Sequence, residues 1–188
     1  MKKSFIPSLY LALMHYPVVN KNGDIITSAV TNLDLHDISR AVKTYGVKKF
    51  YVVTPLADQR KLVERIISHW ITGTGSRYNP ERGEALKKIC VKNSLIEVIE
   101  HIADSEKKIP KTVVTCAGNN PDGLQYGKLR KMLETCNPYL LIFGTAWGLS
   151  ENFISKADYL LVPVKGNTDY NHLSVRSAAS IILDRLLG

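Results

Sequence analysis

Two short apolar runs near the C-terminus, each followed at once by a glycine-bearing loop, most constrain how this chain can fold. The first run covers residues 139–143 and enters a loop at Gly144, and the second covers residues 159–164 and enters a loop at Gly166. Both runs are apolar throughout rather than alternating, which is typical of parallel strands covered on both faces. Loops at the carboxyl ends of such strands border a crevice for small ligands. The sequence therefore predicts a ligand site at these two loops.

The rest of the chain repeats a strand-then-helix order, which predicts an α/β fold. Six segments are expected to be strands: residues 9–14, 49–54, 88–91, 112–117, 139–143 and 159–164. Helices are expected at residues 34–46, 56–71, 95–103, 126–135 and 173–183. A chain of 188 residues fits one well-buried domain, so we expect residues 1–188 to form a single-domain parallel sheet with helices on both faces.

Local signals refine this outline at three places. Asp34 is expected to be the N-cap of the first helix, and Gly46 is expected to end it. The glycine-rich residues 72–83 are expected to form a loop, which by its length is a candidate lid. Gly73-Thr74-Gly75 lacks a following Gly-Lys-Ser/Thr and does not follow a strand, so a P-loop or dinucleotide site is disfavoured.

Composition indicates a cytoplasmic protein with no membrane attachment. Hydrophobic residues make up 45% and charged residues 22%, and no apolar run approaches the twenty residues of a membrane span. After Met1-Lys2-Lys3 the apolar run is too broken for a signal peptide. Cys90, Cys116 and Cys136 show no C-x-x-C spacing, so we expect reduced core thiols and neither disulfides nor a metal site. The net charge of +8 favours a polyanionic partner such as RNA.

The two C-terminal loops resemble the closing motifs of the SPOUT superfamily of RNA methyltransferases. In its ribose-methylating branch, a strand ending in Ile-Pro leads to Gly and, six residues later, to Asn-x-Ser-Val-Ala before a helix. Here Val162-Pro163, Gly166, His172 and Ser174-Val175 keep that spacing, with His172 in place of Asn. The earlier loop, residues 144–148, is shorter than the family's Gly-x-Glu-x-x-Gly and lacks its acid. The likeness is closest to a bacterial subgroup of SPOUT RNA methyltransferases.

This resemblance implies a fold, a cofactor and partners. The implied fold is the α/β knot, in which the C-terminal segment threads a loop to make a deep trefoil knot. The implied protein is a homodimer that methylates tRNA or rRNA with S-adenosylmethionine, held bent among three loops. The residues then expected to bind the cofactor are Cys116, Ala117, Gly118, Phe143, Gly144, Thr145, Trp147, Gly148, Leu149, Val162, Val164, Gly166, Asn171, His172 and Leu173.

The segment from Asp34 to Gly46 is similar to the family's first motif, Asn-x5-Arg-x5-Gly. Arg40 and Gly46 keep the spacing, and Asp34 stands in place of Asn. In the ribose methyltransferases the arginine at this position meets the RNA or the reacting hydroxyl, often across the dimer. From the residues alone, an amphipathic helix with a solvated or ion-paired arginine explains the pattern equally well. His36 and Asp37 could orient Arg40 from the preceding turn.

Asp169 is the candidate catalytic base. Methyl transfer from S-adenosylmethionine is a displacement at a sulfonium, in which the protein positions the acceptor and can remove its proton. Asp169-Tyr170 resembles the loop of the tRNA guanine-N1 methyltransferases of the same superfamily, where an Asp is the proposed base. Alternatively, Asp169 caps the last helix or a turn, and His172 or neither residue is the base. Trp147 could stack on adenine or pack in the core.

Two rival functions remain open at the level of the sequence. The first is a non-catalytic RNA-binding module that retains the SPOUT fold, since the motif acid is missing and His172 replaces Asn. The second is a nucleotide-binding enzyme of flavodoxin-like fold. The residues do not distinguish base from ribose methylation, and they do not indicate which RNA is modified.

Overall fold

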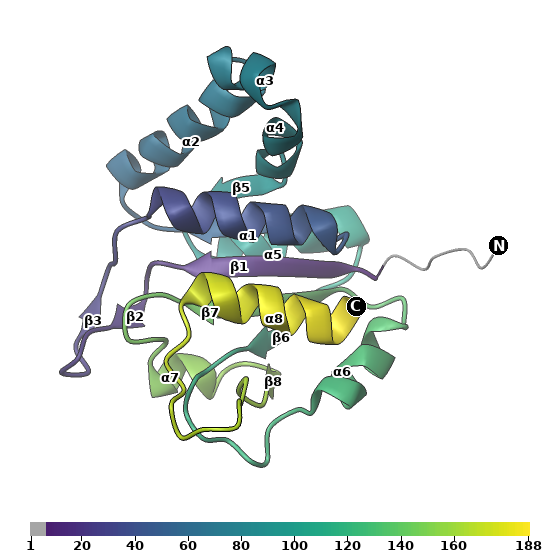
Figure 1. Ribbon diagram of the computed structural model, residues 1–188. Coiled ribbons are helices and arrows are strands. Elements are labelled where there is room, and N and C mark those ends of the chain that lie inside the picture. The colour runs from purple at the N-terminus through teal and green to yellow at the C-terminus, as the bar shows by residue number, and fades with distance from the viewer. Residues whose placement is uncertain (1–6) are drawn as a thin grey trace.

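A computed structural model describes residues 7–188 as a six-stranded sheet between two layers of helices (Figure 1). All neighbouring strands are parallel, and Leu9 lies opposite Tyr139 at the centre of the sheet. The strands, in spatial order, are β5 (Ile89–Lys92), β4 (Phe50–Val53), β1 (Leu9–Met14), β7 (Tyr139–Gly144), β6 (Lys111–Val114) and β8 (Tyr159–Leu160). A small antiparallel pair, β2 (Val18–Val19) and β3 (Ile25–Ile26), follows β1. Met1-Lys2-Lys3, considered above for a signal peptide, lies outside the described residues.

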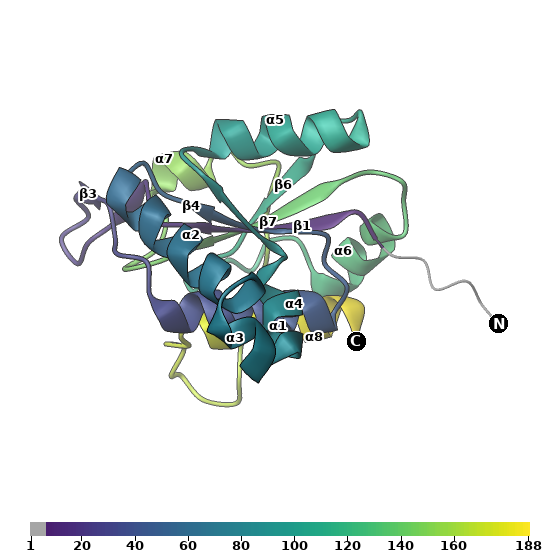
Figure 2. The same cartoon turned by 90° about the horizontal axis from the view of Figure 1, so that it is seen from above.

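The helices cover both faces of the sheet, as predicted (Figure 2). One face carries α1 (Asn32–Thr44), α2 (Ala57–Ile71), α4 (Pro80–Leu86), α6 (Tyr126–Leu133) and α8 (Val175–Leu187). The other face carries α5 (Leu95–Glu106) and α7 (Glu151–Ile154), and α3 (Thr74–Tyr78) connects α2 to α4. Alternate residues of β1 enter the two cores: Leu11 and Leu13 one, and Ala12 and Met14 the other. Burial on both faces explains why the strands are apolar throughout.

Three local predictions were wrong. The N-cap of α1 is Thr31, whose hydroxyl oxygen accepts a hydrogen bond from the Asp34 backbone N–H, so Asp34 lies inside the first turn. Residues 72–83 form α3 and the start of α4 rather than a loop, so no lid is present there. Asn79 caps α4 and Pro80 opens it, a start signal that the surrounding glycines obscured. β8 ends at Leu160 rather than at residue 164, since the chain leaves the sheet after one isolated bridge at Leu161.

The end of α1 agrees with the sequence, whereas the positions of the cysteines do not. Gly46 ends α1 with a φ of 71°, a backbone conformation that favours glycine, as predicted. All three cysteines are free, but Cys136 is exposed and Cys90 and Cys116 are only partly buried, so the expected core positions were wrong. None of the helices described here is long and apolar enough to cross a membrane.

The last helix returns to the middle of the sheet. α8 follows β8 at the edge, yet it packs beside α1 and against β7 (Figure 1). The two helices are tied at both ends. Arg176 of α8 pairs with Asp34 of α1 at 3.0 Å, and the Tyr45 hydroxyl donates to Asp184 Oδ1 at 2.8 Å. Residues 161–174 therefore pass from the sheet edge back across the carboxyl ends of the neighbouring strands.

Candidate functional site

The loops that follow β6, β7 and β8 lie at the carboxyl ends of three neighbouring strands. Their strands are neighbours, because β6 pairs with both β7 and β8. The Asn171 side-chain amide donates to the Ala117 carbonyl at 2.9 Å, and Lys165 Nζ donates to Asn119 Oδ1 at 2.9 Å. Gly118 N–H donates to Cys116 Sγ at 3.1 Å, which shapes the first loop. The loops after β6 and β8 are thus joined directly, and the loop after β7 follows the strand next to β6.

The loop after β7 turns back sharply on itself. A Cβ atom on Gly144 would lie 3.0 Å from the Gly148 carbonyl carbon and the Leu149 nitrogen, so the turn requires glycine. Ala146 has a φ of 52°, an unusual value for a residue with a side chain. Two backbone hydrogen bonds hold the turn against β2, from Trp147 N–H to Val19 O at 3.1 Å and from Val19 N–H to Gly148 O at 2.9 Å. Strain that the surrounding structure maintains is frequent at functional sites.

The residues of the loops differ in exposure, and exposure decides whether a side chain or only the backbone can contact a ligand. The side chains of Phe143 and Leu149 belong to the two cores, so only their backbone groups face the loop surface. Trp147 is 71% exposed, which excludes the core-packing alternative and leaves its indole ring free to stack. Val162 and Val164 are partly buried, while Gly166 and Leu173 are exposed.

The last loop leaves its main chain available. Between Pro163 and Leu173 no backbone N–H or C=O group forms a backbone–backbone hydrogen bond with any described residue. Such groups need partners when they are buried, whether from protein, water or a ligand. A Cβ atom at Gly166 would meet nothing within 4 Å, so there is open space beside this backbone. A ligand seated here can therefore be held by main-chain donors and acceptors.

A buried polar chain, which sequence reasoning missed, anchors the β7 loop to the end of β1. The Thr145 hydroxyl donates to the Met14 carbonyl at 2.9 Å, so its oxygen accepts from the Ser28 hydroxyl. The Ser28 oxygen in turn accepts from His15 Nδ1 at 3.0 Å. His15 is fully buried, and burial lowers its pKa to about 4. His15 is therefore neutral near pH 7 and carries its proton on Nδ1.

This burial predicts how stability depends on pH. The unfolded chain binds a proton at His15 below a pH of about 6.5, while the folded chain does so only below about 4. Folding stability should therefore fall by about 3 kcal/mol as the pH drops from 6.5 to 4. The His15→Asn variant should lack this portion of the fall, because Asn does not titrate. Urea unfolding of both proteins at several pH values measures the difference, and equal pH slopes would contradict a buried neutral His15.

Arg40 forms no hydrogen bond or ion pair to the three loops within the described residues. Arg40 is exposed on α1 and forms no ion pair within residues 7–188. Asp37, which could have oriented it, instead forms an ion pair with Arg176, whose Nε lies 3.3 Å from Asp37 Oδ2. Arg176 also pairs with the buried carboxylate of Asp34. Arg176 stands where the SPOUT motif has Ala, and this departure was the available signal for the contact between α1 and α8.

Asp169 and its neighbours project from the last loop. The N-cap of α8 is Ser174, whose hydroxyl oxygen accepts from Ser177 N–H at 3.2 Å, so Asp169 does not cap this helix. Asp169 is exposed, and its carboxylate accepts no hydrogen bond from the described residues. Tyr170 and His172 are also exposed and meet edge to face, with their ring centroids 5.3 Å apart. Asp169 is thus free to accept a proton from a bound substrate.

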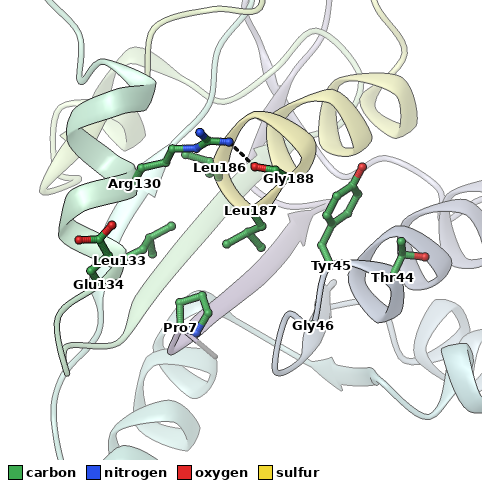
Figure 3. A pocket seen from close by; sticks show the side chains of 10 residues that line it. All are labelled: Pro7, Thr44, Tyr45, Gly46, Arg130, Leu133, Glu134, Leu186, Leu187 and Gly188. Carbon is green, nitrogen blue, oxygen red and sulfur yellow. Dashed lines mark hydrogen bonds between the residues drawn. The ribbon is translucent and has the colours of Figure 1, made fainter. Parts of the chain in front are cut away.

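Two hollows lie outside these loops. The larger, about 550 Å³, lies near the amino end of β1, between the C-terminal ends of α1, α6 and α8 (Figure 3). There the Arg130 guanidinium donates to the Gly188 carbonyl at 2.6 Å. The second, about 440 Å³, is lined by residues before and within α6 and by residues 158–160. Neither contains the residues expected to bind the cofactor, so the candidate site is an open surface between loops rather than one of these hollows.

Comparison with known proteins shows which family the chain belongs to. The sequence model of a family described as SAM-dependent RNA methyltransferase matches residues 8–188. Over 181 residues, 96% of this chain, the sequence is 46% identical to a tRNA (guanine-N(1)-)-methyltransferase of Nitratidesulfovibrio vulgaris. The chain spans only 42% of that relative's length. It is 38% identical to an uncharacterized protein of Aquifex aeolicus, over 95% of this chain and 88% of that protein.

A solved structure agrees with the fold. The SpoU methyltransferase AviRb of Streptomyces viridochromogenes, in complex with the cofactor AdoMet, is similar with a TM-score of 0.55. The similarity covers 95% of this chain and 56% of AviRb at 18% sequence identity, a level that speaks for the fold alone. The parallel α/β sheet described above is the architecture shared with this SPOUT-type neighbour. Since the family match extends over nearly the whole length, this chain belongs to the SAM-dependent RNA methyltransferases.

Proposed function

We propose that this protein transfers a methyl group from S-adenosylmethionine to a nucleotide of tRNA or rRNA at the surface formed by the three loops. The observation that carries the proposal is the main chain of residues 163–173, which forms no backbone–backbone hydrogen bond with the described residues and which Asn171 fastens to the loop after β6. A ligand rich in donors and acceptors matches such a backbone. The relative named for tRNA methylation makes tRNA the first substrate to test.

The residues of the loops suit this cofactor. Open space beside Gly148 and Gly166 admits a ligand close to the backbone, and partly buried Val162 and Val164 offer apolar surface to an adenine ring. When bound, S-adenosylmethionine supplies a methyl group on a positively charged sulfur. The protein's part is to hold the acceptor atom in line with that methyl group. All fifteen residues expected from the sequence remain the proposed cofactor contacts, with Phe143 acting through its backbone.

Asp169 is the proposed base. Its carboxylate takes the proton from the acceptor N–H or O–H while the acceptor forms its bond to the methyl carbon and the carbon–sulfur bond breaks. The products are the methylated nucleotide, S-adenosylhomocysteine and a proton held by the protein. The carboxylate is exposed and unpaired within residues 7–188, which leaves it available for this role. His172, also exposed on the same loop, is the alternative base.

We infer that the active protein is a cytoplasmic homodimer with a C-terminal trefoil knot. The return of residues 161–174 from the edge strand to a helix beside α1 supports the knot. The outer surface of α8 carries the small residues Ser177 and Ala178. Leu33, at the start of α1, is 60% exposed, and Leu173, just before α8, is 44% exposed. Light scattering at micromolar concentration that gave the 21.0 kDa monomer would contradict the dimer.

Gly166→Val is the test of the cofactor site. A Cβ atom here meets no protein atom within 4 Å, so the variant should fold as stably as the wild type. It should bind S-adenosylmethionine about ten- to a hundredfold more weakly, because added methyl groups in a filled site cost about 1–3 kcal/mol. Calorimetric titration measures the affinity, and Gly127→Val, at another open position on α6, is the matched control. Unchanged affinity in Gly166→Val would place the cofactor elsewhere.

The same titration separates methyl transfer from the rival RNA-binding module. A module without a cofactor site would release no heat on addition of S-adenosylmethionine to the wild type. Nucleoside mass spectrometry then tests the reaction. RNA from a strain lacking the gene, incubated with protein and cofactor, should gain one methylated nucleoside that untreated RNA lacks.

A further inference from the structure

Three lysines lie on or next to the two strands at the edge of the sheet opposite the cofactor loops. Side chains along a strand alternate between faces. Ile89 and Val91 pack into the core beneath α1, so Lys92 points to the face that carries α5. Tyr51 belongs to the core beneath α5, so Lys49, two residues earlier, points to that face as well. Lys88, in the turn before β5, is the neighbour of Lys49 in the register of β4 and β5. Lys49, Lys88 and Lys92, named here the edge lysines, therefore lie together at this edge.

The carboxylates around the edge lysines are engaged by other groups. Glu84 pairs with Lys43 and Lys87, and Glu106 pairs with Lys48. Glu97, on α5, accepts hydrogen bonds from Asn93. Within residues 7–188 none of the edge lysines forms an ion pair. No carboxylate therefore pairs directly with the edge lysines, although Glu97 of α5 lies near Lys92.

The electrostatic surroundings of Lys88 and His101 agree with positive charge gathered at this edge. Burial and then the positive charges of Lys43 and Lys49 lower the pKa of Lys88. Burial and then Lys92 and Lys49 likewise lower the pKa of His101, which lies on α5. Lys88 Nζ is held in place by the Val47 carbonyl at 3.1 Å. A fixed group of like charges is unfavourable in the free protein, and a polyanion would relieve it.

Protection of an exposed strand edge is the simpler explanation for lysines on β5. Lysines at sheet edges hinder edge-to-edge aggregation. That explanation covers Lys88 and Lys92, which flank or lie on the edge strand, but not Lys49, which precedes the inner strand β4. It also does not require Lys88 to be held by the Val47 backbone carbonyl, which lies between α1 and β4. The gathering of all three lysines at this edge needs a further reason.

We propose that the edge lysines bind the phosphate backbone of the substrate RNA at a distance from the nucleotide that is methylated. This inference rests on the proposed function, because it takes RNA as the substrate. β5 is three strands away from β7, a distance of about 14 Å at roughly 4.8 Å per strand. An RNA stem or loop can span this distance. Lysine ammonium groups position such a backbone without reading its sequence.

The test replaces Lys49, Lys88 and Lys92 together by Gln and measures binding of unmodified bulk tRNA at several salt concentrations. Each lost phosphate contact lowers the slope of log affinity against log salt by about 0.7–0.9, so the slope should become shallower by about 2–3. Affinity near physiological salt should fall about ten- to a hundredfold. S-adenosylmethionine affinity should not change, since the edge lysines lie across the sheet from its loops.

Two matched variants make the result specific. The triple Lys→Arg variant keeps the charges and should retain the wild-type salt slope. A triple Gln variant at Lys21, Lys61 and Lys107 changes the net charge equally at exposed positions elsewhere, and it should lose little affinity. If the edge-lysine Gln variant kept the wild-type slope, or only aggregated, the proposal would be overturned and edge protection would stand. Binding of the wild type to anionic lipid vesicles but not to tRNA would also overturn it.

The same measurements keep this inference apart from the proposed function. If the wild type bound tRNA through the edge lysines but gave no heat with S-adenosylmethionine, the RNA surface would stand and methyl transfer would fail. If it bound the cofactor and methylated tRNA while the Gln variant showed the wild-type salt slope, methyl transfer would stand and the RNA surface would fail.

Discussion

The Asp169→Asn variant should transfer methyl groups about a hundredfold or more slowly than the wild type while binding S-adenosylmethionine within a few-fold as tightly. The amide has nearly the same size as the carboxylate but cannot accept the proton of the attacking nucleotide. Because Asp169 is exposed and unpaired within the described residues, the exchange should not disturb the fold. The loss should appear in kcat rather than in the cofactor affinity, as expected for a group that acts on the nucleophile.

Single-turnover methylation with labelled cofactor measures this rate on saturating RNA. Asp58→Asn, at an exposed position on α2, is the matched control and should react at the wild-type rate. Wild-type turnover by Asp169→Asn would exclude this carboxylate as the base and direct attention to His172. The same assay on His172→Gln would then decide whether the second exposed group of the loop removes the proton.

The Arg40→Ala variant should lose a comparable amount of activity. Mixing it with the Asp169→Asn variant should restore part of that activity. Arg40 makes no hydrogen bond or ion pair to the three loops of its own chain within residues 7–188. If it steers the acceptor, it must reach the site of a second copy. A heterodimer of Arg40→Ala with Asp169→Asn then contains one site with both wild-type residues. Equal mixing should recover about a quarter of the wild-type sites, because half of the dimers are mixed and each contains one intact site.

This complementation has a direct control. Mixing Asp169→Asn with Arg65→Ala, an exposed arginine on α2, should recover activity only from the intact Arg65→Ala protein. If Arg40→Ala is inactive and mixing recovers nothing, the site is complete within one chain. Full activity of Arg40→Ala alone would make Arg40 a solvated helix residue.

Predictions from local patterns were confirmed where one segment contains its own signal. The six strands were recognised because continuous apolar runs are rare outside strands buried on both faces. α1 was recognised from its apolar spacing and from Gly46. Glycines at 73 and 75 suggested a loop, but there the absence of a side chain allows α3 to approach Trp70: a Cβ atom on Gly75 would lie 2.7 Å from its ring. Close packing and turn formation use the same residue, so the pattern could not separate them.

The supports of the candidate site were not predictable from the sequence. Ser28 and Thr145 are separated by 117 residues and Asp34 and Arg176 by 142, and no periodicity connects such positions. Their hydrogen bonds and ion pairs depend on strand order, which places β1 next to β7 and α1 next to α8. The burial that keeps His15 neutral likewise depends on what packs around it.

The amino-acid sequence by itself therefore determined the α/β class, the strands, most helices and the three loops at which a ligand is expected, because apolar periodicity and glycine act within one segment. The tertiary structure alone decided which side chains are free to act. In the folded chain Asp37 forms an ion pair with Arg176, whereas Asp169 and Arg40 have no ion-pair partner among the described residues. Trp147 is exposed on a turn in which the preceding residue has a positive φ. The physical reason is that availability depends on contacts between distant segments, and such contacts exist only once the sheet is assembled.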